Sequence, residues 1–178
     1  MAKAATKQGR FHQTKNGLKG NALKVSVATL QERLADGIDL ALAVKQAHWN
    51  LKGPGFIGIH TMLDGFRAEL DEYNDTVAER ITQLGGTARG TTQAVGSETK
   101  LEPYPLDVYA IADHLAALID RYAAYANAVR RNIDETDEAG DAGTADLFTE
   151  ISRGVDKQLW FLEAHVQEPL GNMRDGNK

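Results

Sequence analysis

Four side chains of types that commonly bind metal ions lie at helical spacing between residues 60 and 79. His60 and Asp64 are four residues apart, as are Asp75 and Glu79, so each pair lies on one face of an α-helix. At about 100° per residue, all four fall within a sector of about 100°. The apolar residues of this segment lie almost opposite that sector: Ile59, Leu63, Phe66, Leu70, Tyr73, Val77, Ile81 and Leu84. The candidate ligands therefore point away from the core that their own helix helps to form.

The distance between the two pairs indicates a site shared by two subunits. Asp64 and Asp75 are 11 residues apart, which is about 16 Å along a helix. Because metal–ligand bonds are about 2 Å long, one ion cannot bind both residues of one helix. A two-fold axis near the middle of the helix would bring His60 and Asp64 of one subunit to Asp75 and Glu79 of the other. Imidazole and carboxylate ligands without thiolate suit Fe(II), Mn(II) or Zn(II), and the chain has no cysteine.

Alternative explanations exist for each of these residues. Asp75 and Glu79 are also explained as solvated acids, or as ion-pair partners of Arg67 and Arg80. Eleven residues separate His48 from His60 across a turn, so antiparallel helices can bring the two rings together. His48 also falls on an apolar part of its helix, which equally fits a buried structural histidine. The two remaining helical histidines are expected at the surface or at helix ends: His114 and His165.

Composition indicates one globular domain with a basic N-terminal segment. The chain has 178 residues, 42% of them hydrophobic, and a net charge of −5. No apolar run approaches the roughly 18 residues of a membrane span, and no signal-peptide core is evident, so we expect a cytoplasmic protein. Residues 1–31 contain six basic residues and no acid: Lys3, Lys7, Arg10, Lys15, Lys19 and Lys24. This asymmetry favours either a polyanion-binding tail or a solvated tail without a specific partner.

Apolar periodicity predicts an all-α fold, with long helices over about 26–51, 57–84, from Asp107 onward, and 144–167. We expect Leu42 on the apolar stripe of the first helix and Asp107 as the N-cap of the third. We expect a tail at 1–25, a four-helix bundle at 26–168 and a short C-terminal tail at 169–178. Residues 86–105 form a long connection that has room for a short helix near 92–95. Such a connection can cross the length of the bundle, so that the second and third long helices run parallel, as in ferritin-like topology.

Other chemistry is poorly represented. No phosphate-binding glycine loop and no Gly-x-Ser-x-Gly nucleophile motif is present. The two Glu-x-x-His motifs of an in-bundle di-iron centre are also missing. Seven acids with no interrupting Lys or Arg surround the turn after the third long helix: Asp134, Glu135, Asp137, Glu138, Asp141, Asp146 and Glu150. Around a symmetry axis they would form a negative funnel for cations; alone they are an ordinary charged turn.

The ordered motifs of this chain resemble those of the Dps family, the DNA-binding proteins from starved cells. The resemblance rests on five segments: Lys45–Asn50, His60–Arg67, Asp75–Arg80, Gln83–Gly86 and Asp156–Phe161. It implies a ferritin-like four-helix bundle assembled as a hollow homododecamer. It further implies a two-iron ferroxidase site at the two-fold interface. One subunit would supply His48, His60 and Asp64, and its neighbour would supply Asp75 and Glu79.

The same resemblance implies oxidation of Fe(II), preferably by hydrogen peroxide, and storage of ferric mineral in the cavity. Trp49 would either intercept stray oxidising equivalents beside the site or pack at the interface. Asp141 and Asp146 would line an iron-entry pore. Association with the nucleoid would come from non-specific DNA binding through the tail residues Lys3, Lys7, Arg10, Lys15 and Lys19. Two alternatives are a non-enzymatic DNA-compacting protein and an oxygen-using mini-ferritin that does not bind DNA.

Overall fold

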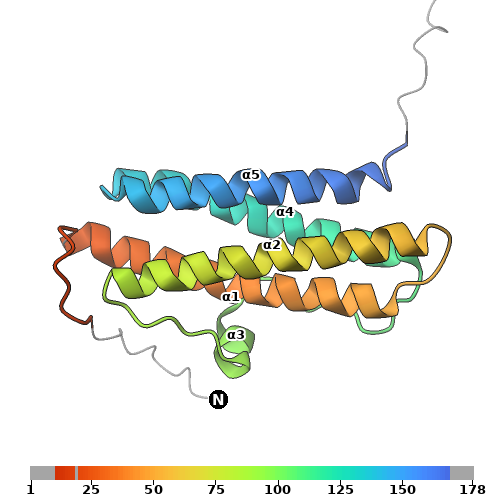
Figure 1. Ribbon diagram of the computed structural model, residues 1–178, viewed down its shortest axis with the longest axis horizontal. Helices are drawn as coiled ribbons and strands as arrows, with labels where there is room; N and C mark the ends of the chain where they lie inside the picture. Colours follow the sequence, from red (N-terminus) through yellow and green to blue (C-terminus); the bar gives the residue numbers. More distant parts are fainter. Residues whose placement is uncertain (1–10, 19, 169–178) are drawn as a thin grey trace, which may run out of the picture.

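Five helices make up the regular structure of residues 11–18 and 20–168, the part of the chain that this computed structural model describes. The helices are α1 (Gly20–Asn50), α2 (Phe56–Gln83), α3 (Thr92–Glu98), α4 (Ile111–Glu138) and α5 (Ala142–Ala164). The four long helices form a bundle, and the short α3 lies beside α1 on the outside (Figure 1). None of the described helices is long and apolar enough to span a membrane.

The connection between α2 and α4 runs back along the whole bundle. Its last residues reach the α1–α2 turn, where the Lys52 N–H donates to the Tyr109 carbonyl (2.9 Å) and the Ile111 N–H to the Lys52 carbonyl (3.2 Å). Since α4 therefore begins near the start of α2, the two helices run parallel (Figure 1). The structure confirms the predicted crossover and its short helix, which spans Thr92–Glu98.

Glycines define both ends of α2. Gly55, with φ of 80°, precedes its first residue. At the other end the Gly86 N–H donates to the Ile81 carbonyl and the Gly85 N–H to the Thr82 carbonyl, both at 2.9 Å. This is the Schellman arrangement, which needs a left-handed residue, and Gly85 provides it with φ of 81°. The candidate ligands of α2 therefore lie on one uninterrupted helix.

The first described residues are held against the C-terminal end of α2 at His12. The His12 N–H donates to the Gly85 carbonyl (2.7 Å), and a Cβ atom at Gly85 would lie only 2.5 Å from the His12 carbonyl oxygen. Helix α1 begins at Gly20 rather than near residue 26. Within the additional turns Ala22 is buried, a tertiary contribution that tail composition does not reveal.

The predicted apolar stripes form most of the core, which includes Leu34, Leu63, Tyr122 and Phe148. Two expectations are wrong. Leu42 is 46% exposed because it lies outside the buried stripe of α1. Asp107 does not cap α4, because the chain stays extended up to Ala110 and pairs there with Lys52.

Candidate metal centre

Three of the five predicted ligands meet where α1 ends and α2 begins. His48 lies in the last turn of α1, and His60 and Asp64 lie in the first turns of α2. One candidate ligand atom from each residue lies within 4.8 Å of the other two. Ligands on opposite sides of one ion are separated by about 4.2 Å at bond lengths of about 2.1 Å. This cluster therefore has nearly the size of a single-ion site.

The two imidazoles, here called the histidine pair, hold each other in a fixed orientation. His48 Nδ1 lies 2.9 Å from the His60 carbonyl oxygen, and His60 Nδ1 lies 3.0 Å from the His48 carbonyl oxygen. A carbonyl oxygen only accepts hydrogen bonds, so each Nδ1 carries the proton. Each Nε2 then keeps its lone pair, the tautomer in which histidine binds metals. The rings stack with their centroids 3.6 Å apart, and His48 is 6% exposed.

Asp64 is paired with a lysine that sequence reasoning did not assign to the site. Lys45 Nζ lies 2.6 Å from Asp64 Oδ1. The hydrogen bond from Lys45 lowers the pKa of Asp64 below its ordinary value, so the carboxylate stays ionised. The only sequence signal was the position of Lys45, one helical turn before His48. Lys45 Nζ also lies 5.9 Å from the ring centroid of Trp49, whose side chain is 67% exposed.

Asp75 and Glu79, here called the acidic pair, are exposed on α2. Neither side chain forms a hydrogen bond or ion pair with another described residue. The arginines that could have explained them bind elsewhere. Arg67 Nε donates to both carboxylate oxygens of Asp71 at 2.8 Å, and Arg80 binds an acid of the α4–α5 turn. The ion-pair explanation of the acidic pair is therefore wrong within the described part of the chain.

Asp141 has a structural position that does not fit an open pore. It is 3% exposed and caps α5 by accepting from the Thr144 N–H (3.1 Å). It also accepts from Ser26 Oγ (2.7 Å) and pairs with Arg80 Nη2 (2.9 Å), which links α1, α2 and α5. We correct the sequence-based assignment accordingly, because this carboxylate is saturated inside its own subunit. Asp146, the other predicted pore acid, is exposed.

Of the remaining predicted residues, the structure describes only some. Lys15 is exposed, whereas four of the proposed DNA contacts lie outside the described residues: Lys3, Lys7, Arg10 and Lys19. His165 follows α5 as its exposed C-cap, as expected. His114 is wrong as a surface histidine, since it is 1% exposed and bonded through Nδ1 to the Tyr104 hydroxyl (2.8 Å).

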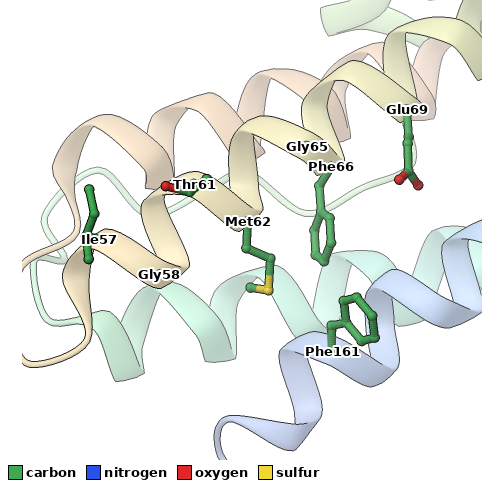
Figure 2. A pocket seen from close by; sticks show the side chains of 8 residues that line it. All are labelled: Ile57, Gly58, Thr61, Met62, Gly65, Phe66, Glu69 and Phe161. Carbon is green, nitrogen blue, oxygen red and sulfur yellow. The ribbon is translucent and has the colours of Figure 1, made fainter.

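A groove between α2 and α5 is a separate feature from this cluster. Figure 2 shows Met62 and Phe66 of α2 pointing toward Phe161 of α5. The only ionisable side chain in its lining is Glu69, which accepts a hydrogen bond from Gln158 (2.8 Å). The groove contains no histidine and therefore lacks the ligands of a transition-metal site.

Comparisons with known proteins agree with this architecture. The family described as Ferritin-like domain matches residues 27–169. A DNA protection during starvation protein from Agrobacterium fabrum is 61% identical over 159 residues, covering 89% of this chain and 98% of that relative. A solved Mycobacterium smegmatis Dps has a TM-score of 0.85 at 31% identity, covering 89% of this chain and 96% of its own. DpsC from Streptomyces coelicolor has a TM-score of 0.86 at 30% identity, with coverages of 94% and 99%.

Proposed function

Because the chain belongs to the Dps family of ferritin-like proteins, we propose that it is a ferroxidase whose metal site is completed by a second subunit. One observation carries the proposal. The histidine pair and Asp64 form a preorganised half-site, while the acidic pair further along the same helix face has no partner among the described residues of its own subunit. The proposed assembly is a shell of twelve subunits that stores ferric iron inside.

The residues would divide the work of binding the substrate, Fe(II). His48 and His60 present Nε2 lone pairs, and Asp64 adds a negative charge beside them. Asp75 and Glu79 of the neighbouring subunit would supply the carboxylates that balance the charge of two iron ions. Since a mixed set of nitrogen and carboxylate ligands suits both Fe(II) and Fe(III), the site can hold iron before and after oxidation.

The proposed oxidant is hydrogen peroxide. Two Fe(II) ions each lose one electron, the O–O bond breaks, and two protons are taken up to give two Fe(III) ions and two water molecules. Paired irons deliver both electrons together, so no hydroxyl radical is released. Trp49 lies beside the site and would either intercept a stray oxidising equivalent or pack against the partner.

Lys45 would act as a placeholder for the metal. In the protomer its ammonium group neutralises Asp64, at 2.6 Å. Binding of a cation between Asp64 and the histidine pair would displace Lys45 toward Trp49 and solvent. The ion pair therefore keeps the half-site assembled without iron, and it competes modestly with iron, because Asp64 is half exposed.

Iron entry would use the exposed acids around the α4–α5 turn, with Asp146 retained and Asp141 excluded because it is buried. An acidic entrance raises the local concentration of Fe(II). Exchange of Asp146 for Asn should slow mineralisation at low iron concentration and leave the rate at saturating iron unchanged.

Non-specific DNA binding is a second proposed activity, supported by the basic N-terminal segment and by the name of the relatives. Phosphate neutralisation would make this binding fall steeply with salt. Because His12 is tied to Gly85, removal of residues 1–10 tests the basic residues before that anchor and leaves the anchor intact. Gel retardation should be lost in this deletion. Retardation equal to that of the full chain would contradict DNA binding by this segment.

The test of the ferroxidase proposal compares the full chain with Asp75→Asn/Glu79→Gln. Anaerobic Fe(II) loading is followed by peroxide, while ferric absorbance is recorded. Fast oxidation in the full chain, reduced at least about 100-fold in the variant, is expected, because ligand loss exceeds the effect of losing outer-shell groups. Equal slow oxidation in both would instead favour a non-enzymatic DNA-compacting protein, and a preference for oxygen would favour an oxygen-using mini-ferritin.

A further inference from the structure

The middle of α2 carries an ion pair on the same side as the candidate metal ligands. Arg67 Nε lies 2.8 Å from both carboxylate oxygens of Asp71, and Arg67 Nη1 donates to the Ala41 carbonyl of α1 (3.1 Å). Nη2 of Arg67 forms no hydrogen bond with the described residues. The side chains of Arg67 and Asp71 are 30% and 52% exposed, respectively. This guanidinium is therefore held in place with donors still free.

The proposed intersubunit site fixes how two copies of α2 would meet. If His60 faces the partner's Glu79 and Asp64 faces the partner's Asp75, the two-fold axis passes between residues 69 and 70. Arg67 then lies within about 1.5 Å, measured along the helix, of the level of the partner's Asp71. Arg67 and Asp71 are also within about 40° of each other around α2. A two-fold axis perpendicular to the helices therefore brings the Arg67 and Asp71 side of one α2 against the same side of the other.

We infer that Arg67 and Asp71 of two copies of this chain form a four-charge cluster on the two-fold axis. Each guanidinium would bind Asp71 of its own chain and, through its free donors, the partner's Asp71. This inference rests on the proposed intersubunit site and assigns a second copy of the chain as the partner of this surface.

Exposed apolar side chains on the neighbouring helix support the same surface. Leu42 and Trp49 of α1 are 46% and 67% exposed, and their spacing of seven residues places them on one side of α1. Leu42 follows Ala41, which accepts the hydrogen bond from Arg67, and Trp49 lies beside Lys45 at the metal half-site. Large apolar side chains around a satisfied charged group are typical of an interface between subunits.

The cluster would set the register between the two helices. A slip of one helical turn displaces the acidic pair by about 5.4 Å relative to the histidine pair, which is more than two metal–ligand bond lengths. Apolar contacts tolerate small displacements, whereas alternating charges on an axis favour one alignment. Arg67 and Asp71 are therefore positioning residues for the metal site.

Charge reversal tests the cluster through assembly in the absence of iron. Native mass spectrometry is applied to the full chain, to Asp71→Arg, which places four arginines on the axis, and to Arg67→Asp, which places four acids there. At micromolar protein, we expect the assembled fraction to fall at least about tenfold in each. The double exchange Arg67→Asp/Asp71→Arg should recover it, because charges alternate again. Matched controls are Arg130→Asp, which breaks an exposed ion pair between Arg130 of α4 and Asp156 of α5, and Asp75→Asn/Glu79→Gln.

Several outcomes would decide the inference. Normal assembly of Asp71→Arg would overturn it, as would failure of the double exchange to exceed the single variants. Asp71→Arg is decisive even if Arg67→Asp unfolds, because among the described residues Asp71 contacts only Arg67 through its carboxylate. The Asp75→Asn/Glu79→Gln control should assemble without oxidising iron. A failed cluster with intact oxidation by the full chain would therefore leave the proposed function standing.

Discussion

The two ends of α2 carry similar ligand types in opposite states of organisation. At the first end, His60 stacks on His48, each ring bonds the other residue's backbone, and Asp64 is held by Lys45. At the other end, Asp75 and Glu79 are exposed and have no bonded partner among the described residues. In the proposed site, one subunit would orient half of the ligands and leave the other half free to approach a neighbour. One helix would then contribute to two sites without completing either.

Substitution of an acid that has bonded partners should lower the free energy of unfolding much more than substitution of an acid that has none. Asp141→Asn should lower the free energy of unfolding by about 3 kcal/mol, because it leaves Arg80 without its counter-charge in a buried network. Asp75→Asn should change it by less than about 0.5 kcal/mol. Urea unfolding followed by circular dichroism at one protein concentration measures both. Equal losses in the two variants would contradict the contrast.

Among substitutions in the proposed half-site of His48, His60 and Asp64, those in the histidine pair should reduce Fe(II) affinity most. His48→Gln removes one proposed nitrogen ligand and the carbonyl-oriented ring on which His60 stacks, so Fe(II) affinity should fall about 10- to 100-fold. His165→Gln is the control, since this histidine lies at the exposed end of α5. Anaerobic equilibrium titration with Fe(II) measures both variants. Unchanged affinity in His48→Gln would show that His60 and Asp64 bind without the stacked partner.

Acid should remove the contribution of Asp141 to the free energy of unfolding. Burial raises the pKa of Asp141, yet hydrogen bonds from Thr144 and Ser26 and the charge of Arg80 bring it below its ordinary value. Its stabilising effect is therefore full above the unfolded pKa, near 4, and is lost as pH falls through the lower folded value. The stability difference between the full chain and Asp141→Asn should stay constant from pH 8 to 5 and shrink below about pH 4. A difference independent of pH would contradict this.

Substitution of Lys45 should have the smallest effect on Fe(II) affinity. Lys45→Met removes the competitor for Asp64 and keeps much of the side-chain volume, so Fe(II) should bind about threefold more tightly, as expected for an exposed ion pair. Lys52→Met, a lysine near the α1–α2 turn that lies over Tyr109, is the control. Weaker binding in Lys45→Met would show that Lys45 organises the half-site more than it competes.

The helices were predictable because long apolar stripes and glycine turns are local signals. The same signals placed His60, Asp64, Asp75 and Glu79 on one face, and the ordered motifs indicated the family. What the sequence left open depended on tertiary contacts. The close approach of His48 to His60, for example, depends on the reciprocal bonds between each ring and the other residue's backbone.

The errors have the same physical origin. Asp141 was predicted to be one of several exposed acids in a charged turn, because its partners Ser26 and Arg80 are distant in the sequence. His114 was predicted to be a surface residue, because its hydrogen-bond partner Tyr104 lies in the connection between α2 and α4. Leu42 was predicted to lie in the core, because an apolar residue on an exposed helix face has the same local signal as one that faces its own bundle.

Complementation between two inactive subunits tests the intersubunit site most directly. Asp64→Asn and Glu79→Gln chains are each purified, mixed, dissociated and reassembled, and peroxide-driven oxidation of Fe(II) is then measured. In a dimer of the two variants one site carries both substitutions and the other carries none, so activity should rise well above that of either parent. A mixture as inactive as its parents, with mixed assembly verified by mass, would contradict a site shared between subunits.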